Sequence, residues 1–273
     1  MGNTCPVCCL ILTIGCYARF DLSMFKKLAL AFTLSLAAST ASAQEIDAET
    51  EDFVSSNLIA IFYHELGHAL IDILQLPVFG QEEDAADVLS VVMVHELFDE
   101  ETAVAITYAT AYGFLGEAED RESQGADVAW WGVHGADLQR YYTLVCLFYG
   151  ASPDEREDVA EELGLPEERA ITCEDEYQLA NDSWGPVLDE LYEAGAGDSL
   201  VYSDMGDDAP FAVLTHNVIV AELTALNEVL SLPTPLKVSV AYCGEANAFY
   251  DPSAVEVTMC IEFAEYLAEL SNQ

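Results

Sequence analysis

The stretch from Phe53 to Leu74, FVSSNLIAIFYHELGHALIDIL, constrains the fold of this chain most strongly. Its spacing is helical, and apolar residues occupy most of the circumference instead of a single stripe. A helix of this kind is buried, so other elements have to cover it on several sides. Pro77 and Gly80 follow and are expected to end the helix.

The remainder of the chain predicts more helices, then a few short strands near the C-terminus. Residues 44–52 are expected to be a mobile acidic start, and residues 117–127 a polar loop. The other expected helices cover residues 82–97, 101–115, 130–150, 153–163, 173–193, 215–231 and a closing segment from Cys260. The expected strands cover residues 199–203, 236–242 and 255–259. This order predicts a helix-rich α+β domain with a small C-terminal sheet.

The N-terminal part of the chain has the layout of an export signal. Residues 24–43, MFKKLALAFTLSLAASTASA, contain two lysines, an apolar run and small residues that end at Ala43, where cleavage is expected. The apolar run is about a dozen residues, shorter than the roughly 20 that span a bilayer. A single-pass anchor is the alternative. Residues 1–23 are interpreted as an artefactual extension upstream of a true start at Met24, and residues 44–273 as a single domain.

Cysteines and charge place the expected domain outside the cytoplasm and limit its partners. Four cysteines follow the signal, and an even number in an exported chain favours disulfides. Proximity favours the pairs Cys146–Cys173 and Cys243–Cys260, with free buried thiols as the alternative. The chain has 8 Lys+Arg against 49 Asp+Glu, a formal net charge of −41. Such a surface repels nucleic acid and anionic membranes, and we expect no stable membrane insertion after cleavage.

The segment His64-Glu-Leu-Gly-His68 carries the main chemical prediction. The two histidines are four residues apart, so on a helix they lie on the same face and can bind one metal ion. Glu65, beside them, can take a proton from a metal-bound water. Zinc (Zn²⁺) in such a site needs a third protein ligand and keeps a fourth position for water. The alternatives are an ordinary helix with hydrogen-bonded histidines and a zinc site without catalysis.

A cluster of carboxylates after the first helix offers the third ligand. The candidates are Glu82, Glu83, Asp84 and Asp87. A turn through residues 75–81 is long enough to bring them back to His68, since an extended residue covers about 3.3 Å. Glu83 and Asp87 are four apart, so if Glu83 is a ligand, Asp87 can accept a hydrogen bond from a histidine N–H as an outer partner. We therefore prefer Glu83.

A second polar group lies at His134, Asp137 and Arg140, which are expected to share one face of the helix over residues 130–150. A hydrolytic zinc site needs a hydrogen-bond donor for the oxyanion, and His134, Tyr141 or Tyr142 could supply it. The alternative is a structural network in which Asp137 and Arg140 form an ion pair.

Several segments together resemble a known family. They are HELGHALI, PVFGQEEDAAD, HGADLQRYYTLVCLFYG, PEERAITCEDEY and CGEANAFYD. They are similar to a family of secreted bacterial proteins of unknown function, grouped as metallopeptidases by their His-Glu-x-x-His motif. The resemblance covers nearly all of residues 53–270. It implies a zincin-like fold, zinc ligands at His64 and His68 with Glu83 as the third, and Glu65 as the catalytic acid and base.

These observations predict an exported bacterial protein, periplasmic or extracellular, that acts as a zinc-dependent hydrolase on a peptide or protein substrate. Glu65 and His134 are the expected catalytic residues, with Asp87, Asp137 and Arg140 as outer partners. The alternatives are a non-catalytic zinc-stabilised binding protein of the periplasm or cell surface, and a zinc hydrolase with a non-peptide substrate.

Overall fold

The structure is a computed structural model that describes residues 46–203 and 206–272. Residues Gln44–Gln273 cluster as one compact unit. The proposed extension and signal peptide, residues 1–43, lie outside the described residues. No helix within the described ranges combines the length and apolar character that crossing a membrane requires.

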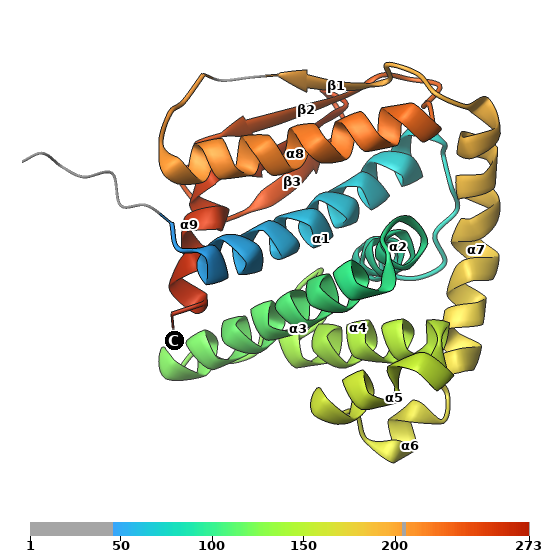
Figure 1. The fold of residues 1–273 in the computed structure, drawn as a ribbon, viewed down its shortest axis with the longest axis vertical. Helices are drawn as coiled ribbons and strands as arrows, with labels where there is room; N and C mark the ends of the chain where they lie inside the picture. The colour runs from blue at the N-terminus through green and yellow to red at the C-terminus, as the bar shows by residue number, and fades with distance from the viewer. Residues whose placement is uncertain (1–45, 204–205, 273) are drawn as a thin grey trace, which may run out of the picture. The chain divides into compact units, whose positions relative to one another are not determined.

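Helix α1 (Ala48–Ile73) is the central element, and its position explains its apolar circumference. It packs against α2 (Glu82–Leu97), α3 (Glu100–Ser123), α8 (Pro210–Val229) and α9 (Ile261–Leu270), and it also meets the sheet. Figure 1 shows α1 between α8 and the sheet on one side and the α2–α4 layer on the other. The side chains of Val54, Leu58 and Phe62 are fully buried.

The remaining helices extend the layer below α1. They are α4 (Asp137–Ala151), α5 (Pro153–Glu162), the short α6 (Glu167–Ala170) and α7 (Cys173–Ala194). Helix α7 packs against α4 and α2, and its N-terminus is tied to α4 by the disulfide Cys146–Cys173. The second predicted disulfide, Cys243–Cys260, is also present.

The C-terminal sheet has four strands in the order β1-β2-β4-β3. They are β1 (Leu200–Ser203), β2 (Leu236–Ala241), β3 (Ala248–Asp251) and β4 (Glu256–Cys260). Helix α8 forms the crossover between the parallel strands β1 and β2, as a parallel pair requires. Strand β3 runs antiparallel to β4 at the edge of the sheet and packs against α1. The helix-rich α+β fold with a small C-terminal sheet is therefore confirmed.

Helix boundaries differ from the expectation at four places, one of which is the start of α8 at Pro210 in place of residue 215. Helix α1 begins earlier, at Ala48, because the side chain of Asp47 caps it by accepting a hydrogen bond from the Thr50 N–H. Helix α3 continues to Ser123 through the expected polar loop, whose Glu, Ala and Arg residues are strong helix formers. Helix α4 begins only at Asp137.

The late start of α4 corrects the prediction that His134, Asp137 and Arg140 share one helix face. Gly132 and Gly135 flank His134, and glycine is a poor helix former. His134 therefore lies in the loop before α4, whereas Asp137 and Arg140 belong to its first turn. Strand β3 was not predicted at all.

Candidate metal centre

The two histidines of α1 present one nitrogen each to the same point. His64 is buried, and its Nε2 lies 3.2 Å from the Nε2 of His68. Their ring planes are nearly perpendicular, with centroids 4.9 Å apart. This arrangement follows from the helical spacing of four residues, which stacks the side chains on one face.

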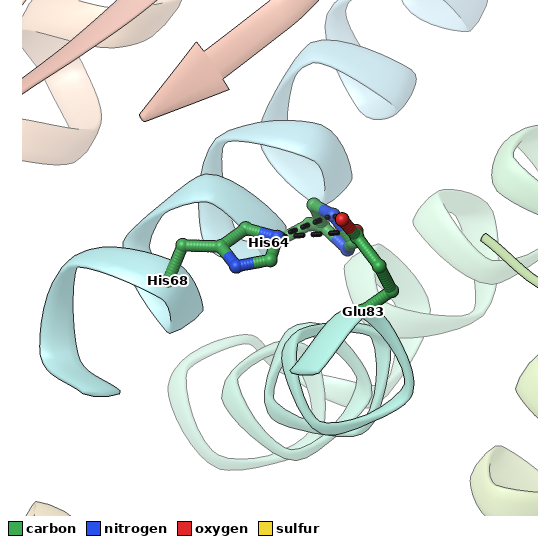
Figure 2. Close-up of side chains that lie close together, drawn as sticks. All are labelled: His64, His68 and Glu83. Carbon is green, nitrogen blue, oxygen red and sulfur yellow. Dashed lines mark hydrogen bonds and ion pairs between the residues drawn. The ribbon is translucent and has the colours of Figure 1, made fainter. Parts of the chain in front are cut away.

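Helix α2 brings a third donor to this point. The Oε2 atom of Glu83 lies 3.3 Å from His64 Nε2 and 3.2 Å from His68 Nε2. Figure 2 shows the three side chains converging from α1 and α2. Within the described ranges, one group of three His, Cys, Asp or Glu residues has ligand atoms that all lie within 4.8 Å of one another. It consists of His64, His68 and Glu83.

The spacing of the three donors tests whether a metal ion fits. Zinc bound tetrahedrally at about 2.0–2.1 Å from nitrogen and oxygen holds neighbouring ligand atoms about 3.3 Å apart. The three edges of the observed triangle are 3.2, 3.2 and 3.3 Å. Two imidazoles and one carboxylate are also donors that zinc prefers. The residues therefore fit a divalent metal ion of this kind.

The other ring nitrogens of both histidines meet carboxylates of α2. His64 Nδ1 lies 2.7 Å from Asp87 Oδ1, and His68 Nδ1 lies 2.8 Å from Glu82 Oε1. Each carboxylate fixes the ring orientation that turns Nε2 toward the shared point. Glu82 is thus an orienting partner of His68, whereas the sequence predicted it only as a possible metal ligand.

Arg140 supports this arrangement from α4. Its Nε and Nη2 atoms donate hydrogen bonds of 2.8 and 2.7 Å to the two oxygens of Asp87. The guanidinium also lies over the ring of Phe114, 4.4 Å from its centroid. Arg140, Asp87 and His64 therefore form a continuous chain that ends at the metal-facing nitrogen.

Asp137 does not join this chain. It forms an ion pair with Arg121 of α3. The alternative prediction of an ion pair between Asp137 and Arg140 is therefore wrong as well. Tyr141 is directed elsewhere too, since its hydroxyl donates to the Leu163 carbonyl at 2.6 Å.

His134 reaches the site from its loop. Its Nε2 lies 2.8 Å from Glu83 Oε2, and its ring stacks at 6.0 Å from that of His64. About half of its side chain is exposed. The structure therefore brings His134 to the candidate ligand Glu83, beside the open side of the centre.

Charges at the centre are strongly coupled. Hydrogen bonds from His134, His64 and His68 hold the pKa of the Glu83 carboxyl far below its usual range. Burial disfavours a charged imidazole, yet the hydrogen bonds to Asp87 and Glu83 raise the pKa of His64 to about 9. A metal ion that binds at His64 therefore competes with a proton for the imidazole nitrogen.

Glu65 differs from the other acids because it is buried and the described residues give it no hydrogen bond or ion pair. Burial raises the pKa of its carboxyl. It lines a cleft of about 930 Å³ that also includes His64, His68 and His134. One wall of this cleft is the edge strand β3. A carboxylate with a raised pKa in a cleft of this size is typical of an acid–base group.

Comparison with known proteins agrees with this site. A protein-family model described as "Putative metallopeptidase" matches residues 25–188 and 210–273, which is most of the chain. The chain belongs to this family. Membership in this metallopeptidase family implies a bound metal and supports peptidase activity at the level of the family. A search of curated proteins finds no match, and a search of solved structures finds none either.

Proposed function

We propose that this member of the metallopeptidase family is an exported zinc-dependent peptidase. The observation that carries the proposal is the triangle of His64 Nε2, His68 Nε2 and Glu83 Oε2 with edges of 3.2–3.3 Å. Three protein donors beside a large open cleft are typical of catalytic zinc sites, whereas structural sites are closed by four protein ligands. This difference favours a hydrolase over a metal-stabilised binding protein.

The chemistry is divided between the metal and two side chains. His64, His68 and Glu83 would hold the zinc ion, which would supply Lewis acidity to polarise a substrate carbonyl and to lower the pKa of a water molecule to about 7. Glu65 accepts the proton of the attacking water and passes it to the leaving amine. His134, whose Nε2 lies 2.8 Å from Glu83 Oε2, would turn to donate a hydrogen bond to the oxyanion that forms.

The surrounding residues hold the metal ligands in orientation and leave the site open to a substrate. Asp87 and Glu82 hold the two imidazoles in orientation, and Arg140 holds Asp87. The cleft is large enough for several residues of a peptide. Two disulfides support export, since such bonds persist mainly in oxidising compartments.

The test is cleavage of a mixed peptide library by purified protein loaded with zinc, with and without a chelator, beside Glu65→Gln. We expect chelation to abolish cleavage and Glu65→Gln to reduce the rate about 10²- to 10⁴-fold, because the proton acceptor is lost. The variant should still bind about one zinc per chain, which separates loss of catalysis from loss of the metal. Equal cleavage by the wild type and Glu65→Gln would remove the role of Glu65. Zinc binding without any hydrolysis would favour the binding protein.

A further inference from the structure

A smaller recess of about 180 Å³ opens from the metal cleft beside the proposed base. The two cavities share the lining residues His64, Glu65, His134, Asn247 and Ala248. The volume is that of a recess for one side chain, well below the 300–1,000 Å³ or so of a pocket for a whole ligand. A substrate side chain next to the scissile bond can therefore enter the recess while the bond faces Glu65.

Apolar residues form about half of the lining of the recess. They are contributed by α1, α2, α3, α4 and α9, with side chains that include Ile61, Val91, Leu144, Phe263 and Leu267. The hydroxyls of Ser90 and Thr110 also face it, but both donate to backbone carbonyls, at 2.8 Å each. Such walls favour the methylene part of a long side chain.

Glu117 of α3 supplies a carboxylate to this recess. The ionisable residues that line it are His64, Glu65, Asp87, Glu117, His134 and Arg140. Of these six residues, Glu65 and Glu117 have no hydrogen bond or ion pair with another residue that the structure describes. Arg140, in contrast, is bound to both oxygens of Asp87. Burial raises the pKa of Glu117, and the charges of Arg140 and Arg121, neither of which pairs with it, lower the pKa by less.

Among the described residues, no lysine or arginine is left unpaired for this carboxylate. The lysine and arginine side chains of the described ranges are each paired with another acid; they are Arg121, Arg140, Arg156, Arg169 and Lys237. The formal net charge of −41 also attracts cationic molecules over long range and repels anionic ones. A substrate is therefore a suitable source of the missing positive charge.

From these observations we infer that the recess is a specificity pocket for a lysine or arginine side chain next to the scissile bond, with Glu117 as its acidic end. The inference rests on the proposed peptidase function and adds the class of substrate. The apolar walls contact the methylene groups, and the Glu117 carboxylate accepts a hydrogen bond from the ammonium or guanidinium group.

The experiment compares two peptides that differ at one residue beside the cleaved bond, lysine or the uncharged norleucine. We expect zinc-loaded wild type to cleave the lysine peptide with a kcat/KM about 10- to 100-fold higher. Glu117→Gln should remove this preference, so that the two peptides are cleaved with a similar kcat/KM. Glu119→Gln is the matched control, because it removes the same charge from an exposed position of the same helix.

Binding supplies a second readout that does not need turnover. Calorimetry with Glu65→Gln protein should show tighter binding of the lysine peptide, with the difference lost when Glu117→Gln is added. If the wild type cleaves no peptide but the lysine peptide still binds more tightly, the peptidase proposal is wrong and the pocket proposal stands. Cleavage with no preference for lysine or arginine, or a preference that survives Glu117→Gln, would overturn the pocket.

Discussion

At the scale of single residues, the centre depends on carboxylates that hold the imidazoles as much as on the donors themselves. His64 is held by Asp87 and His68 by Glu82, but the two partners differ in their surroundings. The Asp87 side chain is 19% exposed and is itself held by Arg140, whereas that of Glu82 is 52% exposed. Water competes more effectively for the hydrogen bond of Glu82, so the loss of Asp87 should weaken metal binding more than the loss of Glu82.

We therefore expect Asp87→Asn to weaken zinc affinity about 10- to 100-fold, and Glu82→Gln to weaken it less. Competition with a chromophoric chelator measures both affinities. Asp84→Asn is the control, because Asp84 is an exposed residue of the same helix that faces a different cavity. An affinity of Asp87→Asn equal to that of the control would contradict the proposed holding role.

Sequence spacing could predict some of these residues and not others. The four-residue intervals between His64 and His68, and between Glu83 and Asp87, survive in the structure because each pair lies on one continuous helix. His134 was singled out, but its position in a loop depends on two glycines and on contacts from a distant helix. Glu117 carries no local pattern, since its place in the recess is set by the packing of several helices.

At the scale of elements, the close approach of α1 and α2 brings Glu83 to the histidines. Gly67 lies inside the His-Glu-x-x-His segment, and a Cβ atom there would meet Ala86 Cα at 2.9 Å and Ala86 Cβ at 3.1 Å. Any side chain at this position would therefore push α2 away from α1.

Gly67→Ala should lower the free energy of unfolding by about 1–3 kcal/mol through overpacking. It should also weaken zinc affinity, because α2 carries Glu83. Urea denaturation and a zinc titration of the same preparation measure the two effects. Gly80→Ala is the matched control, since a Cβ there meets nothing within 4 Å. Unchanged zinc affinity in a destabilised Gly67→Ala protein would show that the helix contact does not set the site.

A second contact between elements joins α5 to the start of α3. Arg156 is fully buried, and its Nε and Nη2 atoms donate to the two oxygens of Glu100 at 2.9 and 2.7 Å. The hydrogen bonds from Arg156 lower the pKa of Glu100 below its ordinary 4.5. A carboxyl whose pKa is lowered by folding stabilises the protein above its unfolded pKa, and this contribution is lost as the pH falls.

Glu100→Gln should thus destabilise the protein at pH 7, by about 1–2 kcal/mol because half of the Glu100 side chain is exposed to water. The difference in the free energy of unfolding between Glu100→Gln and wild type should shrink as the pH falls below 4.5 and then through the lowered pKa of Glu100. Denaturation at a series of pH values measures it, with exposed Glu101→Gln as the control. A difference that stays constant with pH would exclude the ionic contribution.

At the scale of the whole molecule, the confirmed predictions came from features that do not depend on how individual side chains pack. A helix apolar on all sides had to lie at the centre, and α1 does. Cysteines close in sequence formed the two expected disulfides. Strand β3 could not be predicted, because a four-residue edge strand gains its hydrogen bonds from β4 and carries little pattern of its own.

The central claim is that one zinc ion binds between α1 and α2, and the most direct test is an anomalous difference map recorded at the zinc edge from crystals of the zinc-loaded protein. We predict a single strong peak about 2.0–2.2 Å from His64 Nε2, His68 Nε2 and a carboxylate oxygen of Glu83. A peak held by another set of residues, or no peak between these three side chains, would contradict the claim.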